Sequence, residues 1–142
     1  MLVKVGRRAL LDYLCSDPGL AITFHLFKNN PVPADADLLL TDLTEADFAG
    51  YAAITGVVFP GAVINGDLHG ETLSPTQTWT TTGAGLPQTI YGAYVTVTIS
   101  GAPKLLFVRR FATPQVLSLP GETVNKKFDF LDDDGNVPAF GA

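Results

Sequence analysis

Residues 88–99, QTIYGAYVTVTI, and residues 104–111, KLLFVRRF, decide the fold class of this 142-residue chain. Both runs are rich in β-branched and aromatic side chains, and the turn-forming sequence Ser100-Gly101-Ala102-Pro103 separates them. Two such runs around a short turn predict a β-hairpin. The hairpin carries no catalytic motif, so it indicates a β-sheet protein without indicating what the protein does.

More short strands are expected on both sides of this hairpin. In residues 20–28, Ile22, Phe24 and Leu26 alternate with a more mixed set of residues, as the two faces of a strand do. The other predicted strands are residues 51–59, with a bulge at Gly56, residues 79–82 and residues 123–131, and Asn65-Gly66 marks a hairpin turn within residues 62–68. Short strands between Gly- and Pro-rich turns predict a β-sandwich or a small barrel.

Helical segments are expected to be few. Residues 3–15 carry an uneven stripe of Val and Leu, which predicts a helix that ends at Pro18-Gly19. Thr44 precedes Asp47 by three residues, the spacing of a capping box, and this predicts a brief helix or turn.

The composition indicates a globular protein with an unusually apolar surface. Hydrophobic residues make up 46% of the chain and charged residues only 16%, which excludes global disorder. The mean hydropathy is +0.25. A chain with so few charges is expected to cover part of its surface by self-association or by docking on a larger assembly.

Several partners and compartments are not expected. The net charge is −5 and the basic residues are scattered, so no nucleic-acid surface is predicted. No apolar run reaches the roughly 18 residues of a membrane helix. Cys15 is the single cysteine, which excludes an intrachain disulfide. Because the first residues lack the pattern of a signal peptide, we expect synthesis and use without secretion.

Two groups of polar residues could suggest a metal site. Asp67, His69 and Glu71 would share one face of a strand, but the neighbouring glycines favour an exposed loop. The acidic tail contains a superficial calcium-loop pattern, which lacks the glycine and glutamate positions of an EF-hand and is expected to be solvated. Its residues are Asp132, Asp134 and Asn136. We therefore expect no metal and no cofactor.

The residues do not form a recognisable catalytic motif. His25 and Cys15 are expected to be packed residues, and none of the four serines lies in a G-x-S-x-G elbow. The internal carboxylates that deserve consideration as a pair are Glu45, Asp47, Glu71 and Glu122. Nothing distinguishes these acids from surface residues, so we expect the chain not to be an enzyme.

Aromatic and basic side chains suggest contacts with other molecules. Trp79, Tyr91, Tyr94 and Phe107 could stack on a sugar or a base, although core packing is the favoured interpretation. Arg109-Arg110 could bind a phosphate, but with a net charge of −5 a carboxylate of a neighbouring subunit is the favoured partner.

Four segments resemble small structural proteins of tailed bacteriophages. The segments are Leu26-Phe27-Lys28-Asn29-Asn30, residues 43–53 with the sequence LTEADFAGYAA, Tyr91-Gly92-Ala93-Tyr94-Val95 and residues 105–111 with the sequence LLFVRRF. In that group the corresponding segments read LFKNN, TEA-x-F-x-GYA, YGYYV and L-W-x-x-RF. The resemblance covers most of the chain, roughly from Leu10 to Phe130. Ala93 stands where the group often has an aromatic residue.

The resemblance implies a virion component, and jelly-roll members of that group act as capsid cement or decoration proteins. We therefore expect a mainly β chain that forms a jelly-roll-like β-sandwich with a short N-terminal helix. A single domain over residues 1–142 would comprise an arm with the helix at 1–19, the sandwich at 20–131 and a tail at 132–142.

The expected location is the capsid surface of the virion, after synthesis in the host cytoplasm. The expected partners are the major capsid protein and further copies of the chain, as a dimer or trimer, without nucleic acid or membrane. Contacts are expected from both chain ends and from residues 29–37, and the candidate interface residues are Arg7, Arg8, Asn29, Asn30, Arg109, Arg110 and Phe140. The alternatives are a tail or fibre module, and a carbohydrate-binding β-sandwich.

Overall fold

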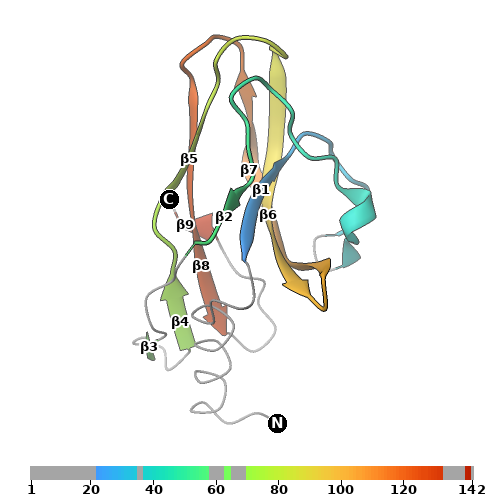
Figure 1. Ribbon diagram of the computed structural model, residues 1–142, viewed down its shortest axis with the longest axis vertical. Coiled ribbons are helices and arrows are strands. Elements are labelled where there is room, and N and C mark those ends of the chain that lie inside the picture. Colours follow the sequence, from blue (N-terminus) through green and yellow to red (C-terminus); the bar gives the residue numbers. More distant parts are fainter. Residues whose placement is uncertain (1–21, 35–36, 58–62, 65–69, 133–139, 142) are drawn as a thin grey trace.

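The computed structural model describes residues 22–34, 37–57, 63–64, 70–132 and 140–141, and strands dominate them (Figure 1). The strands are β1 (Thr23–Phe27), β2 (Ile54–Thr55), β3 (Val63–Ile64), β4 (Gly70–Leu73), β5 (Gln77–Thr80), β6 (Gln88–Ile99), β7 (Ala102–Leu117), β8 (Thr123–Asp132) and β9 (Phe140–Gly141). A short 3-10 helix, η3, spans Leu40–Asp42.

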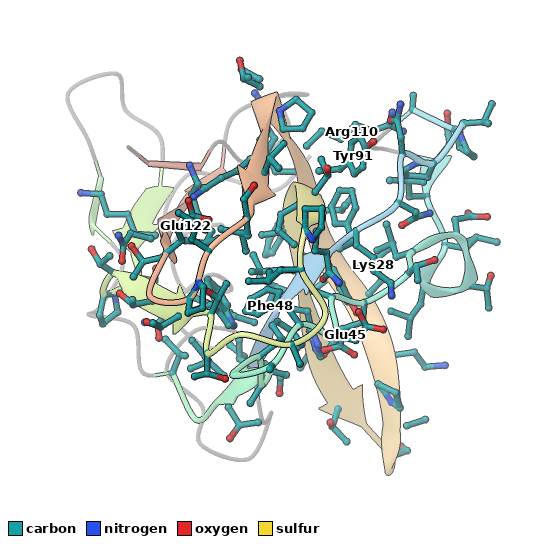
Figure 2. The ribbon with its side chains drawn as sticks, turned by 90° about the horizontal axis from the view of Figure 1, so that it is seen from above. Lys28, Glu45, Phe48, Tyr91, Arg110 and Glu122 are labelled. Carbon is teal, nitrogen blue, oxygen red and sulfur yellow. The ribbon has the colours of Figure 1, made fainter. Side chains whose placement is uncertain are left out.

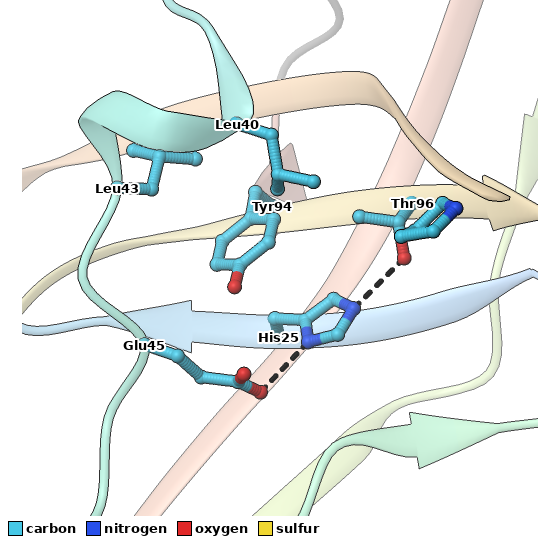
Figure 3. Close-up of a pocket in the computed structure, with 7 residues that line it drawn as sticks. His25, Leu40, Leu43, Glu45, Tyr94 and Thr96 are labelled. Atoms are coloured by element: carbon cyan, nitrogen blue, oxygen red, sulfur yellow. Dashed lines mark hydrogen bonds and ion pairs between the residues drawn. The ribbon is translucent and has the colours of Figure 1, made fainter.

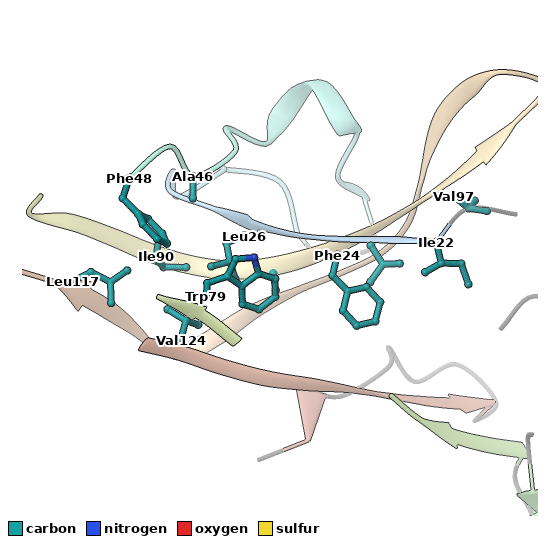
Figure 4. Packing of buried hydrophobic residues seen from close by; sticks show 12 residues of the cluster. Ile22, Phe24, Leu26, Ala46, Phe48, Trp79, Ile90, Val97, Leu117 and Val124 are labelled. Atoms are coloured by element: carbon teal, nitrogen blue, oxygen red, sulfur yellow. The ribbon is translucent and has the colours of Figure 1, made fainter. Parts of the chain in front are cut away.

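The strands form two antiparallel sheets. The first sheet has the order β2-β1-β6-β7, and the second has the order β3-β4-β8-β5 with β9 paired to β8. Side chains from both sheets meet in one buried cluster, so the arrangement is a β-sandwich (Figure 4). The predicted mainly β class is therefore confirmed.

The predicted hairpin is confirmed, with a tighter turn than expected. Ser100 and Gly101 have φ angles of 51° and 78°, the positive values that a two-residue hairpin turn requires. Ala102 and Pro103 therefore pair with β6 as the first residues of β7. The strand is also longer than the predicted residues 104–111, because β7 continues through Pro114 to Leu117. An edge strand tolerates both prolines because one of its sides has no ladder to complete.

An irregularity in the pairing of β6 with β7 accompanies a change in which β6 side chains enter the core. Ile90 pairs with Gln115 but Gly92 pairs with Arg110, so most of the extra residues at this shift lie on β7. Ile90 and Ala93 both face the other sheet, although three positions separate them. Gly92 lies at this shift, where an added Cβ would overlap the Phe27 ring and the carbonyl oxygen of Arg109. Glycine is required there by close packing.

The main cluster fills the space between the sheets. β1 contributes alternate residues, as predicted, and β6 contributes the residues that face the same way. The fully or almost fully buried members are Ile22, Phe24, Leu26, Ala46, Phe48, Trp79, Ile90, Ala93, Val95, Val97, Leu117 and Val124 (Figure 4). We call this set the inner cluster.

A second cluster covers the opposite face of the first sheet. Its buried members are Phe27, Leu38, Tyr94 and Val108, and Leu40, Leu43, Tyr91 and Leu105 pack against them. The leucines at positions 38, 40 and 43 come from the segment around η3 that follows β1. We call this set the outer cluster. It means that the first sheet is buried on both faces.

Three local predictions need correction. The helix expected at Thr44–Asp47 is not formed; η3 lies earlier, and Glu45 instead pairs with Phe27 as an isolated bridge. Within the described part of residues 51–59 only Ile54–Thr55 form a strand. β5 begins two residues before the predicted strand and ends at Thr80.

The remaining predictions concern the last strand, the two chain ends and the turn at Asn65-Gly66. The strand predicted at residues 123–131 is confirmed as β8, which extends to Asp132. Phe140–Gly141, which the sequence places in the C-terminal tail, pair with Lys127 and Phe128 as β9. The helix predicted at residues 3–15 and the turn at Asn65-Gly66 lie outside the described residues.

Candidate functional site

A pocket of about 310 Å³ lies beside the outer cluster. Its apolar lining comes from Leu40, Leu43 and Pro103. The other lining residues are His25, Glu45, Tyr94 and Thr96, so polar groups gather in one part of an otherwise apolar pocket (Figure 3). Pockets of this kind, apolar with a few converging polar groups, are the usual form of a binding site.

Backbone pairing places Glu45 beside β1. Lys28 N–H donates to the Thr44 carbonyl at 2.8 Å, and Ala46 N–H donates to the Leu26 carbonyl at 2.9 Å. Residues 44–46 thus run along the edge of β1 as an additional short ladder. This arrangement brings the Glu45 carboxylate to His25, although twenty residues separate the two in the sequence.

The imidazole of His25 is held by contacts on both nitrogens and on one ring face. Nδ1 lies 2.8 Å from Glu45 Oε1, and Nε2 lies 2.9 Å from Thr96 Oγ1. The Tyr94 ring stacks on the imidazole with centroids 4.5 Å apart and an angle of 7° between the planes. The His25 side chain is 14% exposed and that of Glu45 is 42% exposed, so Glu45 is the member that solvent reaches best.

Tyr51 joins this network to the strand edge. Its hydroxyl accepts from the Leu26 N–H at 3.1 Å and donates to Glu45 Oε1 at 2.8 Å. Burial, reinforced by the Glu45 carboxylate, raises the pKa of Tyr51 well above its usual value. Burial followed by the charge of Glu45 also raises the pKa of Tyr94. Both phenols therefore stay neutral around a single carboxylate.

The order carboxylate, imidazole, hydroxyl is also the connectivity of a nucleophilic triad. Thr96, which would be the nucleophile, is 6% exposed and lies inside β6. The connectivity therefore favours a role in holding the imidazole rigidly.

Two other acids that were candidates for paired chemistry have their own partners. Asp47 Oδ2 lies 2.6 Å from Lys28 Nζ, and Gln88 Nε2 donates to Asp47 Oδ1 at 2.7 Å; these bonds lower the pKa of Asp47. Glu122 Oε2 accepts from the backbone N–H groups of Leu119 and Ser118, which lowers its pKa.

Three predicted interface residues hold the loop after β1 in place. Asn29 donates from Nδ2 to the Asp42 carbonyl and accepts at Oδ1 from the Thr44 N–H, both at 2.8 Å. Arg110 Nη2 donates to the Pro33 carbonyl, and Nη1 donates to Asn30 Oδ1 at 3.3 Å. Arg110, labelled in Figure 2, thus reaches from β7 to the loop that follows β1 in its own chain.

The other predicted interface residues are less informative. Arg109 is half-buried and stands opposite Ala93 in the β6–β7 ladder. The backbone of Phe140 belongs to β9. Arg7 and Arg8 lie outside the described residues, so their roles stay predictions.

Core packing is confirmed for the main aromatic candidates. Trp79 is 2% exposed and donates from Nε1 to the Ala52 carbonyl at 3.0 Å. Tyr94 is 4% exposed, and Tyr91 and Phe107 pack against the two clusters. A sugar ring therefore has no access to the face of Trp79.

The metal-site candidates lie mostly beyond the described residues. Asp67, His69, Asp134 and Asn136 are outside them, and so is Cys15, whereas Glu71 is in β4 and Asp132 ends β8. In the part of the chain that the structure describes, no three His, Cys, Asp or Glu residues gather as metal ligands. Among the same residues, no helix combines the length and the apolar character needed to span a membrane.

Comparisons with known proteins find no match. No protein-family model, no curated protein and no solved structure is similar enough to this chain to be matched.

Proposed function

We propose that this chain is a structural protein of a tailed-phage virion and acts as a capsid cement or decoration protein. It would contact major capsid subunits and further copies of itself on the particle surface, without catalysis. Many modest contacts, repeated over a shell, add through multivalency and stabilise the assembly.

The observation that carries this proposal is an apolar residue presented by an anchored loop. Val32 is 98% exposed. The segment that carries it is fixed by the bonds of Asn29 on one side and by the bond from Arg110 to Pro33 on the other. A pre-ordered loop loses little conformational entropy on docking, which favours binding. Leu39, also in the segment that covers the outer cluster, is 65% exposed.

The segments that resemble phage virion proteins support the same proposal, because their residues hold this loop and complete the adjoining edge of β1. Asn29 and Asn30 of the first segment form hydrogen bonds at the start of the loop, and Arg110 of the last segment binds its Pro33 carbonyl. Glu45 and Tyr51 of the second segment complete the edge of β1. The resemblance therefore extends to the residues that present Val32.

The first experiment is immunogold labelling of intact virions with antibody against this chain. Gold over the head in many copies is the expected result. Gold confined to the tail would replace the cement role with that of a tail or fibre module. Particles without any gold would contradict the virion role itself.

A second experiment tests the loop. Particles lacking the chain are mixed with purified wild-type protein, Val32→Asp or Ala84→Asp, and sedimented. Ala84 is also exposed but lies in the β5–β6 connection. We expect Val32→Asp to reduce co-sedimentation at least tenfold and Ala84→Asp to leave it unchanged. Equal binding of both variants would show that the loop is not the contact.

A further inference from the structure

The pocket beside the outer cluster has two features that its role in packing does not explain. Glu45 Oε1 takes the bonds from both His25 and Tyr51, whereas Oε2 has no hydrogen-bond partner among the described residues. The hydroxyl of Tyr94 has none there either, and because this atom is not fully buried it stays accessible to a ligand. Figure 3 shows this hydroxyl directed toward the side of the pocket where His25 and Glu45 lie.

We propose that this pocket is a socket for the side chain of a lysine from a partner protein. The ammonium group would bind Glu45 Oε2 and the Tyr94 hydroxyl, and the methylene stem would lie against Leu40, Leu43 and Pro103. This inference does not depend on the proposed virion role.

The charges around the pocket favour a cation. Glu45 is the single carboxylate that lines it. The phenols of Tyr51 and Tyr94 add no negative charge at neutral pH, and burial raises both pKa values further. Lys28, a cation on the adjoining segment, is already bound to Asp47 at 2.6 Å. The Glu45 charge therefore lacks a permanent cationic partner among the described residues.

The shape favours lysine over arginine and over larger ligands. About 310 Å³ is near the lower limit for a ligand pocket, so it suits one side chain. Arginine prefers to bind both oxygens of a carboxylate with its planar fork. Because Oε1 already accepts two bonds, Glu45 offers one oxygen, which matches the compact charge of an ammonium group.

The test is an NMR titration of the full-length chain with n-butylammonium, a mimic of the lysine side chain. Saturable shifts at Tyr94, His25 and Leu43 are expected, and n-butanol, which has the same stem without the charge, should not produce them. Glu45→Gln keeps an acceptor for Tyr51 and removes the charge, so we expect it to weaken binding tenfold or more, roughly the contribution of a charge-assisted bond. Glu122→Gln, the matched loss of a remote acid, should bind as the wild type does.

A further variant and a peptide distinguish the remaining outcomes. Tyr94→Phe keeps the ring on His25 and should weaken binding by a few-fold. A blocked tripeptide with a central lysine should bind at least as tightly as n-butylammonium if the natural ligand belongs to a protein. Weaker binding of the tripeptide would show instead a site for a free amine and overturn the assignment to a partner. Absence of saturable shifts, or unchanged binding by Glu45→Gln, would overturn the socket.

Discussion

The inner and outer clusters bury the same sheet on its two faces by different means. The inner cluster is built mainly by strands from both sheets, with Ala46 and Phe48 added from the segment between η3 and β2. The outer cluster is closed by the segment around η3, with leucines that lie on no strand. The strand-built face is fully apolar, whereas the loop-closed face leaves a pocket with His25, Glu45 and Tyr94. The packing of strand side chains in the inner cluster contributes stability, and the irregular segment over the outer cluster leaves a pocket.

The largest effect is expected in the inner cluster. Phe24 is fully buried there, and Phe24→Ala should lower the free energy of unfolding by about 3–5 kcal/mol because it leaves a large cavity. Urea unfolding followed by Trp79 fluorescence measures the loss. Val32→Ala, at a fully exposed position, should change it by less than about 0.5 kcal/mol. A small effect of Phe24→Ala would mean that the inner cluster is not the stabilising core.

A smaller effect is expected in the outer cluster. Leu38 is 7% exposed, and Leu38→Ala should cost about 2 kcal/mol, at the lower end for buried leucines, because a loop can relax around the change. NMR shifts should concentrate at Tyr94 and His25 and leave Trp79 unchanged. Shifts spread equally over both clusters would contradict their separation.

The hydrogen bonds of Asn29, which hold the loop after β1, should contribute less to the free energy of unfolding than Leu38 does. Asn29→Ala removes two hydrogen bonds to the backbone and should cost about 1–2 kcal/mol. Asn30→Ala, which removes one long bond from Arg110, is the matched control and should cost less. Hydrogen exchange at the Thr44 N–H should accelerate in Asn29→Ala. Protection equal to that of the wild type would contradict the bond between Thr44 and Asn29.

The smallest effect concerns Asp47 on the segment that joins the two clusters. Its pKa is lowered by the bonds from Lys28 and Gln88, so its stabilising contribution is present above the unfolded pKa of about 3.9 and is lost as the pH falls through the lower folded pKa. Lys28→Met should raise the pKa of Asp47 toward its usual value in a carboxyl NMR titration. An unchanged titration would show that Lys28 does not bind Asp47 in solution.

The sequence predicts the strand-built region well, because alternation is a local signal. Ile22, Phe24 and Leu26 point to the inner cluster in the structure, as their spacing indicates. The pattern fails in β6, where Ile90 and Ala93 lie on one face beside an irregularity in the pairing with β7. Such an irregularity changes the face of later side chains, and a lone glycine is too common in sequences to predict it.

The loop-closed region is much harder to predict. Thr44 and Asp47 have the spacing of a capping box, yet residues 44–46 pair with β1 because Leu26 and Lys28 offer unpaired backbone groups. The pocket joins His25, Glu45 and Thr96, which strand pairing brings together from distant positions. His25 and Thr96 lie on the less apolar faces of two predicted strands, but this signal does not reveal which strands are neighbours. Glu45 is expected in a brief helix or turn, so no local pattern places it beside His25.

The hydroxyl of Tyr51 has a consequence for how copies of this chain avoid one another. An open strand edge is a template for adding a strand from another molecule, and so for aggregation. At β1 the Leu26 N–H is occupied by a phenol and its carbonyl by Ala46. At the other margin of the same sheet, β7 carries Pro103 and Pro114, each without an N–H to offer. A strand added from another copy would therefore find fewer backbone groups to pair with, both beside the part of β1 that β2 does not cover and along β7.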